Sequence, residues 1–243
     1  GISEIYWRNN QTGVNHIWRL DGRFQTSWSL VYTEAETAWK VVDSGDFNSD
    51  GRADVLWRHS VTGRLYIQHM NGYAVLATSG IVDALADLSW AVAAVADFDG
   101  DGASDILWRN VNDGRITLWR MSGRAPTAVV QIYQERQLNW RVAGAGDFNG
   151  DGFPDVLWRN IVSGENFILL MQGTSVAAGS GQITRVSEQQ WQIVALRDFG
   201  GDGRDDEAEE DRHGTDRGGG PGSRGSRGSR GMSAEAEVRA MLD

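Results

Sequence analysis

Short apolar runs, separated by glycine, asparagine and aspartate, recur along most of the chain. Within one stretch they lie at residues 55–58, 65–68, 74–77 and 90–95. These runs are rich in β-branched and aromatic side chains, which is typical of strands joined by tight turns. The pattern therefore predicts about four short strands in every 50 residues or so.

An acidic segment returns at a nearly constant spacing. The segment that begins at Asp46 reads Asp-Phe-Asn-Ser-Asp-Gly, and copies begin at residues 97, 147 and 198, in steps of 51, 50 and 51 residues. Two tryptophan series keep the same register. One precedes the acidic segment and comprises Trp39, Trp90, Trp140 and Trp191; the other follows it and comprises Trp7, Trp57, Trp108 and Trp158.

A four-stranded unit repeated at this spacing is typical of a propeller blade, because the strands of a sandwich carry no long-period identity and a β-solenoid has a shorter unit. We predict an all-β chain, a β-propeller of four-stranded blades with about four blade-equivalents, over residues 1–206. Glu4 stands where the later repeats carry the ninth loop residue, and the loop before it is missing. We therefore expect a longer parent protein with more blades.

The periodic pattern stops after Gly203. An acidic run starts at Asp205, and a glycine-rich tract with three Gly-Ser-Arg triplets follows it. This composition buries too little apolar surface to offset the entropy of ordering, so we predict a low-complexity, disordered tail over residues 207–243, with one helical turn at 234–242. The abrupt loss of the repeat also suggests that the tail is an aberrant, frame-shifted C-terminus.

Composition argues against several classes of function. The 243 residues carry a formal net charge of −10, with a pI near 4.9, and so offer no basic surface for nucleic acid. There is no cysteine for disulfides or thiolate metal sites. No apolar run approaches the length of a membrane span.

The acidic loops place oxygen atoms at alternate positions of a tight turn. Calcium takes six to eight hard oxygens, and Asp or Asn at positions 1, 3, 5 and 9, with a backbone carbonyl at position 7, would supply them. We predict Ca²⁺ in each of the first three loops. The predicted ligands are Asp46, Asn48, Asp50, Arg52 (carbonyl) and Asp54; Asp97, Asp99, Asp101, Ala103 (carbonyl) and Asp105; and Asp147, Asn149, Asp151, Phe153 (carbonyl) and Asp155.

The fourth loop keeps Asp198, Asp202 and Asp206 but has Gly200 at position 3, so we expect it to bind weakly or to stay empty. An EF-hand is excluded, because its position 12 needs a bidentate Glu and here holds tryptophan. One alternative stays open for all the loops. Their side chains would then only cap their own backbone, as Asp and Asn commonly do in turns.

The motif Asp-Phe-Asn-x-Asp-Gly-x-x-Asp-Val-Leu-Trp-Arg, at residues 46–58 and 147–159, resembles the FG-GAP or VCBS repeats of integrin-α-like propellers. The resemblance covers residues 1–206. It implies a propeller that has seven blades in the commonest members, calcium in the blade loops, and adhesion or ligand binding outside the cell. This chain departs from that pattern in holding only about four repeats.

The remaining candidate residues are aromatic or basic. We assign most tryptophans to packing between blades and take Trp18, Trp28 and Trp119, which fall outside the two series, as candidates for stacking on a ligand. The repeated arginines are expected to form salt bridges with an Asp of a neighbouring blade, with a ligand carboxylate as the alternative. They are Arg8, Arg58, Arg109 and Arg159.

Short-range patterns nominate no nucleophile or catalytic triad. We therefore predict a calcium-binding, non-catalytic module, secreted or at the cell surface, that recognises a glycan or protein ligand. The low affinity of extracellular calcium modules supports that location. The alternatives are an accessory targeting or spacer region of a larger secreted hydrolase and, less favoured, a propeller enzyme.

Overall fold

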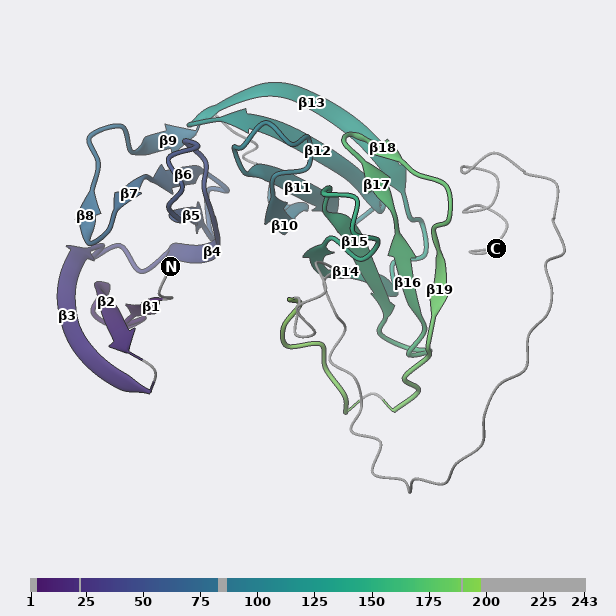
Figure 1. Cartoon of the computed structure of the whole chain (residues 1–243), viewed down its shortest axis with the longest axis horizontal. Helices are drawn as coiled ribbons and strands as arrows, with labels where there is room; N and C mark the ends of the chain where they lie inside the picture. Colours follow the sequence, from purple (N-terminus) through teal and green to yellow (C-terminus); the bar gives the residue numbers. More distant parts are fainter. Residues whose placement is uncertain (1–3, 22, 83–86, 189, 198–243) are drawn as a thin grey trace, which may run out of the picture.

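The computed structural model describes residues 4–21, 23–82, 87–188 and 190–197. These residues form strands joined by turns and no helix, which confirms the all-β prediction (Figure 1). The predicted tail and the fourth loop, with Asp198, Asp202 and Asp206, lie outside the described residues.

The strands form four successive antiparallel main sheets, one for each repeat, and two small two-stranded sheets. The first blade has three strands, β1 (Glu4–Arg8), β2 (Val14–Asp21) and β3 (Phe24–Thr33). The second has β4 (Trp39–Gly45), β5 (Asp54–His59), β6 (Leu65–Gln68) and β9 (Gly80–Val82), with the small pair β7 (Met70–Asn71) and β8 (Ala74–Val75).

The third and fourth blades repeat this order. The third has β10 (Trp90–Ala96), β11 (Asp105–Asn110), β12 (Arg115–Ser122) and β13 (Ala125–Gln134). The fourth has β14 (Trp140–Gly146), β15 (Asp155–Asn160), β16 (Asn166–Leu169) and β19 (Gly181–Ile183), with the pair β17 (Met171–Gln172) and β18 (Ser175–Val176). The predicted four-stranded blade is therefore confirmed.

The outermost strand differs from the expectation at residues 74–77. Only Ala74 and Val75 pair there, in a short hairpin with β7, and β9 forms the outer edge of the blade. The Oγ of Ser79 accepts a hydrogen bond from the backbone N–H of His69 at 2.9 Å. A side-chain hydroxyl therefore pairs the N–H group at the point where the outer strand is interrupted. Ser180 does the same for Leu170 in the fourth blade, also at 2.9 Å.

The blades follow one another along an arc, with the first strand of each blade turned toward a common centre (Figure 1). Contacts between β4 and β10, and between β10 and β14, line that inner side. The outer strands β3 and β13 run along the periphery (Figure 1). This is the arrangement of propeller blades.

The hydrophobic core lies between blades. Trp57, Trp108 and Trp158 each sit in a separate buried cluster, between the first and second, second and third, and third and fourth blades respectively. Trp57 is 3% exposed, whereas Trp7, whose blade has no described blade before it, is 46% exposed. The inter-blade role predicted for this tryptophan series is thus observed wherever a preceding blade is described.

The second strand of the second and third blades is apolar on both faces because it serves two interfaces. In β5, Val55 and Trp57 pack toward the first blade, while Leu56 packs toward the third. Every residue of β5 and of β11 is buried. This double burial explains why these runs read as continuously apolar, without the alternation expected of a half-exposed strand.

The repeated arginines also serve the interfaces. Arg58 and Arg109 are buried, and their guanidinium groups donate hydrogen bonds to the backbone carbonyls of Trp90 and Trp140 in the next blade. Burial, helped by Arg141, lowers the pKa of Arg109 to about 10, so it stays cationic at neutral pH. The expected salt bridge to a neighbouring Asp is therefore replaced by a bond to backbone.

Candidate cation sites in the blade loops

The acidic loops connect the first and second strands of the second, third and fourth blades, between β4 and β5, β10 and β11, and β14 and β15. Position 6 of each loop requires glycine, because its φ is +81° at Gly51 and +90° at both Gly102 and Gly152. The predicted tight turn at this position is therefore present in all three loops.

The carboxylate at position 1 organises the turn. In the second loop, Asp97 accepts hydrogen bonds from the N–H groups of Gly100 at 2.8 Å, Asp101 at 3.1 Å and Gly102 at 2.9 Å. Asp147 accepts the equivalent three, and Asp46 two of them. The self-capping hydrogen bonds of the turn interpretation are thus present. The three bonds to Asp97 use three of the roughly four lone-pair sites of a carboxylate and leave one to offer a cation.

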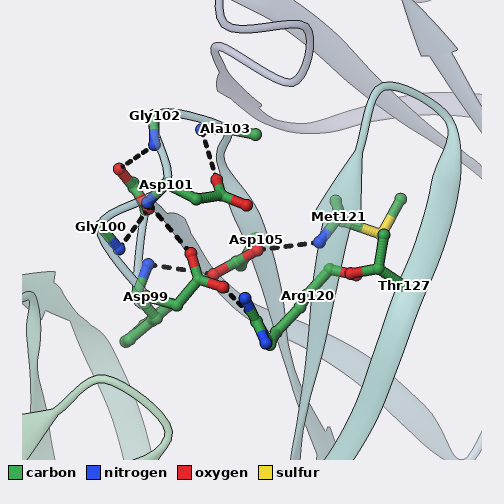
Figure 2. Close-up of polar contacts among 11 residues, drawn as sticks. Asp99, Gly100, Asp101, Gly102, Ala103, Asp105, Arg120, Met121 and Thr127 are labelled. Atoms are coloured by element: carbon green, nitrogen blue, oxygen red, sulfur yellow. Dashed lines mark hydrogen bonds and ion pairs between the residues drawn. The ribbon is translucent and has the colours of Figure 1, made fainter.

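The carboxylate at position 9 ties the loop to the blade. Asp105 is fully buried and accepts hydrogen bonds from the N–H groups of Phe98 at 3.1 Å and Met121 at 2.9 Å (Figure 2). Asp54 and Asp155 make the same two bonds in their own blades. This side chain therefore fixes the loop against the end of the third strand.

Burial raises the pKa of the position 9 carboxyls. The pKa of Asp105 reaches about 7, because burial, with a contribution from the Asp99 and Asp101 carboxylates, outweighs the two backbone hydrogen bonds. The pKa of Asp155 reaches about 6 for the same leading reason, and that of Asp54 is also raised. A nearby cation would favour the ionised form of each carboxyl.

The second loop gathers three of its predicted ligands. Oxygen atoms of Asp97, Asp99 and Asp105 all lie within 4.8 Å of one another, a spacing that one cation can bridge. Asp101 points one oxygen at the N–H of Ala103, 2.8 Å away. In the first and third loops an amide, Asn48 or Asn149, takes the place of Asp99.

The extra carboxylate of the second loop has a basic partner. The Nε of Arg120 donates to Asp99 in an ion pair (Figure 2). Arg120 immediately precedes Met121, and the residues that precede the equivalent Met70 and Met171 are His69 and Leu170. The arginine is therefore found beside the loop with Asp at position 3, not beside the two with Asn, a relationship that the sequence analysis missed.

The other predicted cation ligands are the backbone carbonyls at position 7 of the loops. The N–H groups of Arg52, Ala103 and Phe153 donate to the position 5 carboxylates at 3.0, 2.8 and 2.9 Å. These bonds place all three residues in the loop turn. The cation-binding role of their carbonyls stays a prediction.

The three tryptophans proposed as ligand contacts differ in access. Trp28 is 60% exposed, and Trp18 lies half-buried opposite it in the β2–β3 register. Trp119 is only 8% exposed, because it packs on Trp108 between the second and third blades, with ring centroids 5.2 Å apart. That burial leaves Trp119 without a face for a ligand. The sequence does show that Trp119 is equivalent to Trp18, because the two lie 101 residues, or two repeats, apart.

A family model described as an FG-GAP-like repeat matches the chain four times, at residues 1–57, 46–108, 97–158 and 147–207. No curated protein sequence matches the chain significantly. Among the described residues there is no helix of the length and apolar character needed to cross a membrane.

The fold is similar to that of a solved lectin from Agrocybe aegerita, which specifically recognises non-reducing terminal N-acetylglucosamine. The TM-score is 0.62 at 16% sequence identity, and the match covers 84% of this chain. The chain spans 56% of the lectin chain, little more than half its length. At this identity the likeness concerns the fold.

Proposed function

The chain belongs to the FG-GAP-like repeat family, whose model matches it from residue 1 to 207, and on this basis we propose that it is a calcium-stabilised module that binds glycans outside the cell. The binding role is the coarse conclusion that family and fold both support. Calcium, the glycan and the extracellular location are the finer parts of the proposal.

The observation that carries the calcium proposal is the cluster of Asp97, Asp99 and Asp105. Carboxylate oxygens are the hard ligands that calcium prefers, and three of them converge on a turn that glycine keeps tight. Asp105 is buried with a raised pKa, so a bound cation would supply the charge that keeps it ionised. Calcium would hold the loop closed and neutralise its repulsion.

The residues of the acidic loops in the second and fourth blades also fit calcium. Each presents three carboxylates and one amide oxygen in the same register. Buried Asp54 and Asp155 occupy the position of Asp105. We propose that these two loops bind the same ion, with one carboxylate fewer than the loop of the third blade, which begins at Asp97.

Glycan recognition is supported by the fold and by exposed aromatic side chains. The lectin with the similar fold binds a sugar. Among the described residues, Trp28 and Tyr32 on β3 are open to solvent. The net charge of −10 favours neutral over acidic glycans. Calcium sites of about 10⁻⁴ to 10⁻³ M affinity fill outside the cell, which supports an extracellular location. We propose no catalytic role.

The test is binding of the full chain to a glycan array in millimolar calcium and again in excess chelator. The proposal predicts binding to neutral glycans in calcium and weaker binding in chelator. Asp105→Asn should reduce the calcium dependence, whereas Asp21→Asn, at an exposed position outside the loops, should leave it unchanged. A folded, calcium-loaded chain that binds no glycan would refute glycan recognition. So would a chain that binds a protein partner and no glycan.

A further inference from the structure

A pocket of about 290 Å³ lies between the first and second blades. Tyr32 and Glu34 form its wall on the first blade, at the end of β3. Trp39, Tyr66 and Gln68 contribute from β4 and β6 of the second blade. Its volume is at the lower end of the range for small-molecule sites, which is roughly 300 to 1,000 Å³.

Gln68 is what leaves this interface open. It pairs with Val55, and the equivalent residues, which pair with Ile106 and Val156, are Trp119 and Leu169. Both of these are buried members of their inter-blade clusters. The larger or fully apolar side chains fill the later interfaces, whereas the amide leaves space in the first.

The neighbouring position shows the same contrast. Tyr66 pairs with Trp57 and is half-buried, while its equivalent Phe167 pairs with Trp158 and is buried. Tyr32 on the opposite wall is 48% exposed. The pocket therefore keeps two phenol rings at its surface.

The polar groups of the pocket have a defined orientation. The Oε1 of Gln68 accepts hydrogen bonds from Trp57 Nε1 at 3.0 Å and from the Tyr6 hydroxyl at 3.3 Å. An indole N–H can only donate, so it fixes the side-chain oxygen toward Trp57 and leaves the Nε2 of Gln68 as a donor with no acceptor among the described residues. The Oε2 of Glu34 accepts the Tyr32 hydroxyl at 3.2 Å, which holds that ring beside the carboxylate.

From this geometry we infer that the pocket binds one neutral pyranose ring, such as the terminal residue of a glycan. Aromatic rings offer apolar faces for the C–H face of the sugar. The Glu34 carboxylate accepts hydroxyl hydrogens, and the Gln68 amide and Tyr66 hydroxyl donate. Glu34 disfavours an anionic sugar by repulsion. This inference rests on the proposed function, because it gives the glycan a site.

The experiment titrates the full chain, in millimolar calcium, with the methyl glycosides of glucose, galactose, mannose, N-acetylglucosamine and N-acetylneuraminic acid. Saturation-transfer NMR detects binding and tryptophan fluorescence gives Kd, since Trp39 lies in the wall. Tyr32→Ala should raise Kd about tenfold or more, because it removes a stacking face. Tyr66→Phe should raise it several-fold and should fold normally, because Phe167 occupies the equivalent position.

Phe24→Ala is the matched control, since it also removes an exposed aromatic ring from β3 but outside the pocket. It should leave Kd unchanged. Binding that survives Tyr32→Ala and is lost in Trp28→Ala would overturn the pocket and leave the glycan function intact. A wild-type chain that is folded in calcium and binds none of the five sugars would overturn both. Preference for N-acetylneuraminic acid, an anionic sugar, would overturn the inference that the pocket takes a neutral sugar.

Discussion

The guanidinium carbon of Arg8 lies 4.6 Å from the centre of the Trp57 ring in the next blade. The later blades repeat this pairing, with Arg58 over Trp108 at 5.0 Å and Arg109 over Trp158 at 5.1 Å. Each arginine also donates to a backbone carbonyl at the start of the next blade. One arginine in each of the first three repeats therefore links its blade to the next by a cation–π contact and a charged hydrogen bond.

We expect Arg109→Met to lower the free energy of unfolding by roughly 2 to 3 kcal/mol, because it removes the contact with Trp158 and the buried charged hydrogen bond to the Trp140 carbonyl, which keeps only its bond from Arg141. Urea unfolding measures the change. Arg19→Met is the control, since the Arg19 side chain forms an exposed ion pair with Glu4 at 3.7 Å, and its loss should cost less than about 1 kcal/mol. Equal losses in the two variants would contradict a linking role for Arg109.

Gly114 should tolerate no side chain. Its φ is +77°, and a Cβ there would meet the carbonyl oxygen of Glu135 at 1.6 Å. We expect Gly114→Ala to cost several kcal/mol or to prevent folding. Gly173→Ala is matched, with φ of +61° and open space around it, and should cost only about 1 kcal/mol. Thermal unfolding distinguishes them, and similar melting temperatures would contradict the steric argument.

The repeat itself allowed most of the fold to be predicted. The spacing of about 50 residues predicted the four-stranded blade, the glycine turn of the loops and the inter-blade packing of Trp57 and its equivalents. Equivalent positions in a propeller have similar surroundings, so one repeat informs the others. The departures lie where one repeat differs from the others. Trp119 was misread because it falls outside both tryptophan series, and Gln68 was overlooked because a glutamine among strand residues signals nothing until its neighbours are placed.

The arginines illustrate a second limit. A repeated basic residue in an acidic chain favours a carboxylate partner, and nothing in the sequence shows that the backbone carbonyl of the next blade is nearer. The acidic loops could be predicted from the sequence for the opposite reason, because all of their predicted ligands lie within one short segment. The candidate cation sites are local, and the interface contacts and the pocket are not.

Arg120→Leu should tighten calcium binding to the second loop several-fold, because the variant removes a cation that pairs with Asp99. Leucine is the residue at the equivalent position of the fourth blade, so it should fit. Calorimetric titration of calcium measures the affinity. Arg124→Leu removes the same charge from an arginine that bonds the Ile81 carbonyl and should change little. Weaker binding in Arg120→Leu would contradict competition between arginine and calcium.

The pH dependence of stability should reverse when calcium is added. The folded pKa of Asp105 is about 7, above the unfolded value near 3.9, so without calcium its contribution to stability is full below about pH 4 and is lost as pH rises through 7. The melting temperature in chelator should therefore rise from about pH 8 to about pH 5. In saturating calcium it should fall, because protons compete with the ion.

Asp105→Asn should flatten both trends, since the amide does not titrate and loses a charged ligand. Differential scanning fluorimetry measures the melting temperatures of both chains across the pH range, in calcium and in chelator. A wild-type chain with the same pH profile in calcium and in chelator would show that Asp105 does not respond to the ion.

Thermal unfolding of the full chain in calcium and in excess chelator tests the central claim most directly. At free calcium about ten times Kd, each occupied loop adds roughly 1.4 kcal/mol, and three loops should raise the melting temperature by roughly 10 °C. Magnesium at the same concentration should have a much smaller effect, because it prefers to keep several water ligands. Equal melting temperatures in calcium and chelator would contradict calcium binding and reduce the acidic loops to self-capped turns.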